Sequence, residues 1–325
     1  MGQRGRLVKW DSAGLRRETP RLNTVELTER LSSLSGKASA FRGLMALFGA
    51  IIAGSYLLGR LPDIAPGAGR FVGGLPNFLA IAPFACIPLF IFSGYMLSRY
   101  TKEKKRLISA NVVRDMLADA FDLISYKPEE SISEYHVQES QLRGWKVMQG
   151  SDLLRARYKG VSFTFSDLRL ETGGRHSRTI FAGQWLIVPL RKAISPPLVV
   201  SELAKKGLVN DARSKVQMED IAFSKKFNVL TEDPHTAFYV LTPHFMEFIV
   251  SARQVAQGAK HLCFAGNRAH IALSTGRDSF EPCANVADLR ALRRRIQEEI
   301  DDIKSIIDEF LLNEGLLEIE QPHGA

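Results

Sequence analysis

Two histidines and two cysteines in the last quarter of the chain carry side chains that zinc prefers. They are His261, Cys263, His270 and Cys283. In a strand, His261 and Cys263 would point to one face, and a hairpin would bring His270 opposite them. Buried cysteines are usually inert apolar residues, however, and a strand histidine usually has a structural role. We therefore predict no metal site here, and no disulfide in a reducing cytoplasm.

Other polar residues could serve a hydrolase. Ser162, Ser166 and Asp167 supply hydroxyls and a carboxylate, but no spacing to a histidine distinguishes them from ordinary strand residues. Two pairs of neighbouring acids are Glu219 with Asp220, and Glu232 with Asp233. They could act as acid and base only with perturbed pKa values, and we predict that they are solvated turn residues. Phosphate-loop, HExxH, GxSxG and paired CxxC motifs do not occur. The prediction is therefore that the chain has no catalytic, cofactor-binding or metal-binding residues.

The overall composition is that of a globular protein, but the charge is unevenly distributed. The 325 residues contain 43 Lys and Arg against 35 Asp and Glu, a net charge of +8, with 45% hydrophobic residues and three Cys. This excludes a disordered chain and a disulfide scaffold. Residues 1–106 contain 16 basic and 6 acidic residues, a balance of +10, which leaves −2 for residues 107–325.

Two segments without any charge, residues 43–59 and 71–98, predict a transmembrane helical hairpin. A 17-residue helix is slightly short for the hydrocarbon core, so we place the spans at about residues 39–59 and 78–98, within a hairpin of residues 39–98. Pro83 and Pro88 would bend the second span. A pair of buried helices in a soluble core is the alternative.

The basic residues predict the orientation of this hairpin. Nine basic residues precede the first span and five follow the second, whereas the loop between the spans has two. The positive-inside rule then places both termini in the cytoplasm of a multi-pass protein of the bacterial inner membrane. The first apolar run lies too far from the N-terminus for a cleaved signal peptide. The basic segment 1–38 is either a surface helix at anionic lipid or a disordered arm, and nucleic-acid binding is not expected.

The remainder predicts an α+β domain of antiparallel strands with packed helices. A helix at 102–125 within an amphipathic helical connector, residues 99–152, leads into a domain at 153–284. We expect strands at about 156–171, 179–190, 227–230, 237–241, 262–265 and 269–273, and a helix at 243–258. The first two strands would form a hairpin, and residues 266–268 would close another. Regular strand–helix–strand alternation is missing, which disfavours a parallel nucleotide-binding sheet.

The C-terminal segment 285–315 predicts one amphipathic helix, followed by a tail at 316–325. Its apolar residues recur at spacings close to a heptad seam: Leu289, Leu292, Ile296, Ile300, Ile303, Ile307 and Phe310. Packing against the domain and a coiled coil with a second copy or a partner both remain open.

Several separated blocks resemble domain-of-unknown-function family 3137 of bacterial and archaeal membrane proteins. They are YKGVSFTFSDLRLE, IFAGQWLIV, MEDIAFSKKFNVLTEDPHTAFYVLTPHFMEFIV and the FEP at 280–282, and they span roughly residues 153–282. The resemblance implies a membrane-anchored cytoplasmic domain without an assigned activity or catalytic residues. Because members tend to be encoded near LemA-type membrane proteins, it also suggests a membrane-protein partner.

The predicted function is therefore that of an integral membrane protein whose cytoplasmic domain binds or scaffolds partners. The alternative is a membrane-tethered enzyme, for example a hydrolase, which would need a polar cleft where His261, Cys263, His270 or the acid pairs converge. An oligomeric pore is disfavoured because the apolar segments 43–59 and 71–98 contain no Asp, Glu, Lys, Arg or His.

Overall fold

The computed structural model divides the chain into two compact units, residues 1–111 and 112–325. It describes residues 24–64, 76–202, 208–209, 214–251, 259–276, 279–280, 289–312 and 315–319, without the side chains of 24, 58–64, 76–83 and 85. The first 23 residues of the predicted basic segment, residues 65–75 of the loop between the predicted spans, and Cys283 lie outside the described residues. The boundaries predicted for the domains therefore stay predictions.

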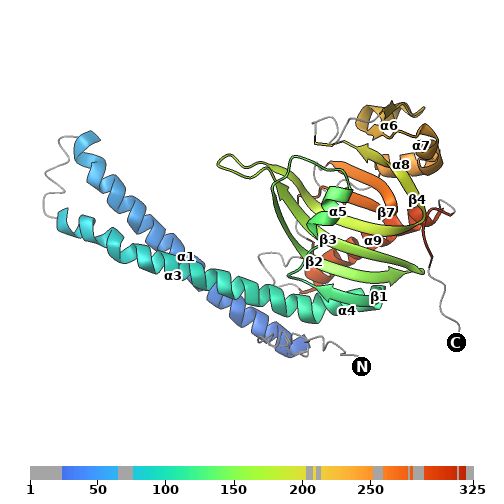
Figure 1. The fold of residues 1–325 in the computed structure, drawn as a ribbon. Helices are drawn as coiled ribbons and strands as arrows, with labels where there is room; N and C mark the ends of the chain where they lie inside the picture. Colours follow the sequence, from blue (N-terminus) through green and yellow to red (C-terminus); the bar gives the residue numbers. More distant parts are fainter. Residues whose placement is uncertain are drawn as a thin grey trace, which may run out of the picture. The chain divides into compact units, whose positions relative to one another are not determined.

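The first unit is a pair of long helices, α1 (Thr24–Ile64) and α3 (Pro76–Ile108) (Figure 1). Phe41 lies 5.7 Å from Tyr100 between ring centroids, and a Cβ added at Gly49 would lie 3.6 Å from the ring of Phe90. The two helices therefore run antiparallel. Helix α1 begins at Thr24, well before residue 39, where the first span was predicted to start.

Helix α1 is long and apolar enough over Val25–Leu57 to cross a membrane, and 6% of its most apolar window is buried. Among the described residues it is the one helix that meets this test. Helix α3 covers the second predicted span, but the side chains at the start of that span lie outside the described residues. One helix is thus a candidate span by length and composition alone, and the two-span hairpin is not confirmed.

The second unit is built on an antiparallel sheet, as the α+β prediction required. The sheet order is β1-β2-β3-β4-β6-β5, and β7 pairs with β4 as well. The strands are β1 (Asp122–Lys127), β2 (Val147–Tyr158), β3 (Val161–Glu171), β4 (Thr179–Ser201), β5 (Lys215–Val216), β6 (Asn228–Leu230) and β7 (Lys260–Leu273). The predicted pairing of residues 161–171 with 179–190 is confirmed by β3 and β4. The run predicted as one strand from 156 divides at Lys159 and Gly160, whose positive φ angles form a two-residue turn between β2 and β3.

The remaining helices connect or cover the strands. A π-helical turn at Ser109–Val113 joins α3 to α4 (Arg114–Ala120). The others are α5 (Glu134–Glu139), α6 (Ile221–Lys226), α7 (Pro234–Val240), α8 (Pro243–Ser251) and α9 (Leu289–Leu312). The helix expected at 102–125 therefore ends at Ala120, and β1 and the start of β2 occupy part of the segment expected to be a helical connector. The end predicted for the helix at 243–258 lies outside the described residues.

Two strand predictions were wrong, for different physical reasons. Residues 237–241 belong to α7, because Asp233 caps this helix by accepting from the backbone N–H of His235 (3.0 Å) and Pro234 starts it. Residues 262–273 are not a hairpin but the continuous strand β7, which pairs with both halves of β4. The register shifts between Pro189 and Ile194 where β7 passes Gly266, so this glycine marks an irregular bend and not a chain reversal.

Helices cover both faces of the sheet (Figure 1). Val137 of α5 belongs to the core cluster that contains Trp185 and Cys263. Phe264, which follows Cys263 and therefore points to the opposite face, contacts Phe310 of α9 at a centroid distance of 6.1 Å. The predicted apolar seam of α9 is buried from Leu292 to Phe310. This helix thus packs its seam within the described part of its own chain.

Candidate functional site

The last residue of α5, Glu139, is the centre of a polar cluster on the α5 face of the sheet. Its carboxylate accepts a hydrogen bond from Nε2 of His270 (3.1 Å) and from Nη1 of Arg268 (2.9 and 3.1 Å). Nδ1 of His136, one helical turn earlier, lies 3.6 Å from the same carboxylate. Burial alone would raise the pKa of Glu139, but the hydrogen bonds and positive charges of His270 and Arg268 outweigh it and lower this pKa to about 2.

His261 lies on the same face of β7 and is completely buried. Its Nε2 is 2.9 Å from the carbonyl oxygen of Ser140, and its Nδ1 is 2.9 Å from the hydroxyl of Ser201. Because a carbonyl can only accept, Nε2 carries the proton, and a neutral ring then accepts from Ser201 at Nδ1. Burial is the main cause that lowers the pKa of His261 to about 4, so the ring is neutral at pH 7.

Cys263 and Trp185 complete this cluster. The Cys263 thiol donates a weak hydrogen bond to the carbonyl oxygen of Glu139 (3.8 Å). The indole of Trp185 lies 6.4 Å from both His261 and His270 between ring centroids. Among the described residues, Trp185 Nε1 and His270 Nδ1 are buried atoms without a hydrogen-bond partner. Buried polar atoms left in this way are the groups that an ordered internal water commonly satisfies.

The structure therefore brings three of the four metal-type residues together, yet it seals them from solvent. His261, Cys263 and His270 are each fully buried. Among the residues that the structure describes, no group of three or more His, Cys, Asp or Glu side chains could hold a metal ion. The guanidinium of Arg268 already pairs with the carboxylate. The arrangement connects α5 to β7 through Glu139.

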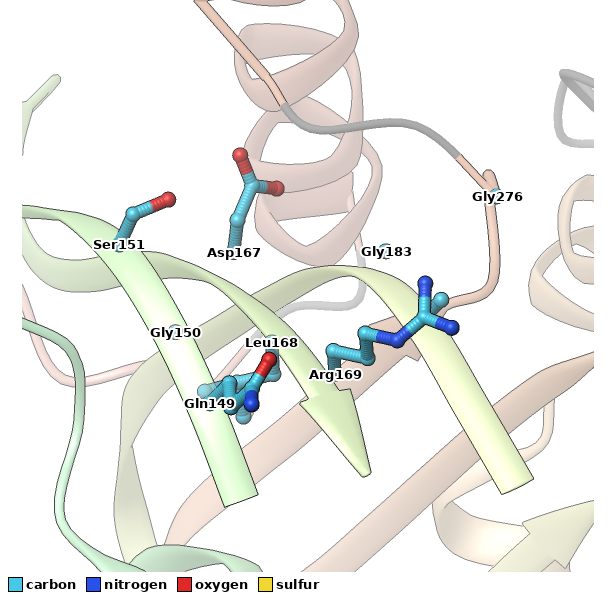
Figure 2. A pocket seen from close by; sticks show the side chains of 9 residues that line it. Gln149, Gly150, Ser151, Asp167, Leu168, Arg169, Gly183 and Gly276 are labelled. Carbon is cyan, nitrogen blue, oxygen red and sulfur yellow. The ribbon is translucent and has the colours of Figure 1, made fainter. Parts of the chain in front are cut away.

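An open pocket of about 300 Å³ lies elsewhere, across β2, β3 and β4 (Figure 2). Its lining comprises residues 149–151, 167–169, 182–183 and 276. Figure 2 shows the side chains of Ser151 and Asp167 pointing to the same side, with the Arg169 guanidinium directed toward Gly276. This is the neighbourhood of the hydrolase candidates Ser166 and Asp167.

The Asp167 carboxylate and the Arg169 guanidinium of this pocket already form hydrogen bonds within the chain. Asp167 accepts hydrogen bonds from the backbone N–H and from the hydroxyl (2.9 Å) of Ser279. The buried Ser166 hydroxyl donates to the carbonyl oxygens of Ser151 (2.8 Å) and Asp167 (3.1 Å). Arg169 donates to Glu171 at 2.6 Å. These bonds fix main chain and turns, so the pocket can accommodate a small polar group, and the hydroxyl of Ser166 is bonded to carbonyl oxygens of the chain.

Two further carboxylates, which the sequence did not single out, influence each other by charge: Glu299 holds the turn at residues 279–280, and Asp152 binds a side chain of β1. Glu299 of α9 accepts from the backbone N–H of Phe280 (2.7 Å), and Asp152 accepts from the Tyr126 hydroxyl (2.5 Å). Burial, with a smaller contribution from the charge of Asp152, raises the pKa of Glu299 above its ordinary value against the opposing effect of Arg295. Phe280, the first residue of the FEP block, is buried by this arrangement.

The acid pairs lie at helix starts. Asp220 caps α6 by accepting from the backbone N–H of Phe223 (2.9 Å). Asp233 caps α7, and a hydrogen bond from the Thr236 hydroxyl is the largest cause that lowers its pKa. Their oxygens serve the backbone at exposed turns, as capping residues do. Neither Asp220 nor Asp233 lines the pocket in Figure 2.

Comparison with known proteins identifies one family. Residues 179–312 match the family model described as "Protein of unknown function (DUF3137)". The match confirms the family resemblance and extends it through α9, while the predicted contribution of residues 153–178 is outside the matched range. No curated protein and no solved structure matches the chain.

Proposed function

Because residues 179–312 match a family model whose description assigns no activity, we propose a role for the whole chain from its physical properties. The chain is a membrane-anchored binding or scaffolding protein. The helices α1 and α3 form the anchor, and the α+β unit binds a partner on the cytoplasmic side of a bacterial inner membrane.

The observation that carries this proposal is the exposed apolar surface of α1. Leu47 is 54% exposed and Leu57 is 63% exposed, and α3 continues such a surface with Phe84 (79%) and Ile91 (64%). A contiguous apolar surface of this length is a liability in water, whereas a bilayer accommodates it. The basic residues outside the charge-free segments support cytoplasmic termini by the positive-inside rule.

The polar chemistry of the α+β unit favours binding over catalysis. His261, Cys263 and His270 are buried. In the open pocket, Asp167 and Arg169 form hydrogen bonds with other residues of the chain. By contrast, Phe238 and Tyr239 of α7 are adjacent aromatic side chains that are 52% and 53% exposed. Large exposed aromatic residues are enriched where proteins bind each other. A membrane-protein partner, of the LemA type by family association, fits this surface, and self-association through the α9 seam would require α9 to leave the domain.

Topology mapping tests the anchor. Cells expressing the full chain are fractionated with alkaline carbonate, and cysteines introduced by Gly67→Cys and Ser177→Cys in a Cys-free background are exposed to an impermeant maleimide. We expect carbonate-resistant membrane association, labelling at position 67 in intact cells, and labelling at position 177 only after lysis. Recovery in the soluble fraction, or labelling of position 177 in intact cells, would contradict the proposal.

Partner binding needs a separate experiment. The full chain is purified in mild detergent, and its assembly mass is compared for wild type, a Phe238→Ser/Tyr239→Ser variant and the control Ile124→Ser, whose side chain is 62% exposed on β1. We expect a defined complex for wild type and for the control, and its loss in the α7 variant. A monomer without partner in the wild type, or equal loss in the control, counts against binding through α7.

A further inference from the structure

Helices α1 and α3 bring together a group of cations that we call the cationic cluster: Lys37, Arg42 and Lys104. Nζ of Lys37 lies 6.0 Å from the ring centroid of Tyr100, and Phe41, next to Arg42, lies 5.7 Å from the same ring. Lys104 follows Tyr100 by one helical turn and therefore lies on the same side of α3. The cluster is thus assembled from both helices.

Lys104 is the unusual member, because its residue is only 9% exposed. Burial is the larger cause that lowers its pKa, and the positive charge of Arg42 lowers it further. The side-chain stem is covered while the ammonium is held near a second cation, and two cations held close repel each other unless an anion compensates them.

No carboxylate of the described residues forms an ion pair with any member of the cluster. Elsewhere on α1, Arg30 has such a partner, since its Nη2 lies 3.4 Å from Glu26. The contrast indicates that the cationic cluster is suited to an anion from outside the chain.

The position of the cluster limits what that anion can be. Arg42 immediately precedes the charge-free residues 43–59, and Tyr100 comes just after the charge-free residues 71–98. At about 1.5 Å per residue, the steps from Arg42 to Lys37 and from Tyr100 to Lys104 cover about 6 to 8 Å of helix axis. That depth corresponds to the polar headgroup layer on one side of a bilayer, roughly 5 to 8 Å beyond the hydrocarbon core.

We propose that the cationic cluster binds the phosphate of one anionic phospholipid at the cytoplasmic surface. The inference rests on the proposed membrane location. The Lys104 ammonium and the Arg42 guanidinium donate to the phosphate oxygens, Lys37 adds a third positive charge, and the acyl chains lie along the exposed apolar surface of α1.

Lipid exchange on the purified full chain tests this inference. Three proteins are compared: the wild type, the site variant Arg42→Gln/Lys104→Gln and the control Arg99→Gln/Lys102→Gln. Both variants remove the same positive charge, and both control residues are exposed. Each protein is delipidated in detergent and titrated with phosphatidylglycerol or with phosphatidylcholine. Bound lipid is counted by native mass spectrometry, and thermal unfolding is recorded for the same samples.

We expect one retained phosphatidylglycerol on the wild type and the control, and at least a tenfold lower occupancy on the site variant. Without lipid, the site variant should unfold at the same or a higher temperature than wild type, because the repulsion between Arg42 and Lys104 is gone, yet phosphatidylglycerol should no longer raise that temperature. Equal retention by all three proteins, equal loss in the control, or equal binding of phosphatidylcholine overturns the inference. These outcomes leave membrane insertion intact, whereas a wild type that is soluble without detergent refutes the proposed membrane location itself.

Discussion

Replacing Glu139 by Gln tests whether the polar cluster beneath α5 stabilises the domain. The variant keeps the size and one acceptor oxygen of the side chain but removes the charge that faces His270 and Arg268. A pKa lowered from 4.5 to about 2 corresponds to roughly 3 kcal/mol at about 1.4 kcal/mol per pH unit. Since the Arg268 side chain is 42% exposed, water screens part of this interaction, and we expect a loss of about 2 kcal/mol at pH 7.

The pH dependence of this loss follows from its sign. The pKa of Glu139 is depressed in the folded state, so its stabilisation is complete above pH 4.5 and disappears as the pH falls toward 2. The difference in the free energy of unfolding between wild type and Glu139→Gln should therefore close over this window. Urea unfolding of the full chain in detergent, followed by tryptophan fluorescence at pH 2.5 to 7, measures it.

Glu171→Gln is the matched control for this experiment. Glu171 also pairs with an arginine, since Nε of Arg169 lies 2.6 Å away, and its pKa is lowered mainly by that hydrogen bond. This pair lies at the surface, where ion pairs contribute little, so the control should unfold like wild type. A Glu139→Gln loss that equals the control, or that persists unchanged at pH 2.5, would refute the reasoning.

Three further substitutions test other parts of the domain. Wild type should lose up to about 3 kcal/mol of stability as the pH falls from 6.5 toward 4, because the depressed pKa makes protonation of buried His261 unfavourable. His261→Gln should abolish this loss, which urea unfolding in that pH window measures. Gly183→Ala should cost about 1 to 3 kcal/mol, since a Cβ would collide with the backbone oxygen of Leu273, and thermal unfolding measures the cost. Lys260→Met should increase hydrogen exchange at the end of α8, because the Lys260 ammonium donates to the carbonyl oxygen of Ile249 at 2.5 Å.

Strand β3 and helix α9 were predicted correctly because the spacing of apolar residues within each segment is sufficient to identify it. Strand β3 alternates Val161, Phe163 and Phe165 with polar residues, so its inward face is legible from the chain alone. The seam of α9 is legible for the same reason. Prediction of α7 failed because the cap at Asp233 and Pro234 determines the start of a helix more strongly than a short apolar run determines a strand.

The polar cluster could not be predicted, because its members are distant in sequence. Glu139 and His270 are 131 positions apart, and His261 and Ser140 are 121 apart. No local pattern links such residues, since their contact depends on how β7 is aligned with β4 and where α5 crosses that sheet. The hairpin that was expected to bring His270 opposite His261 was wrong, and the residue that bonds to His270 is Glu139, for which the spacing gave no signal.

The same distance gives the cluster a physical role in folding. Successive residues of β7 point to opposite faces, so a slip of one residue against β4 would move His261 and Cys263 to the face covered by α9. There His261 would lose the Ser140 carbonyl, and Glu139 would lose both Arg268 and His270, which lie on the same strand. A buried polar group without its partner costs about 1 to 3 kcal/mol, which penalises the slipped register several times over. The sealed histidines therefore act most directly on the alignment of β7, and variants at Glu139 should populate misregistered or partly folded states before any effect on partner binding appears.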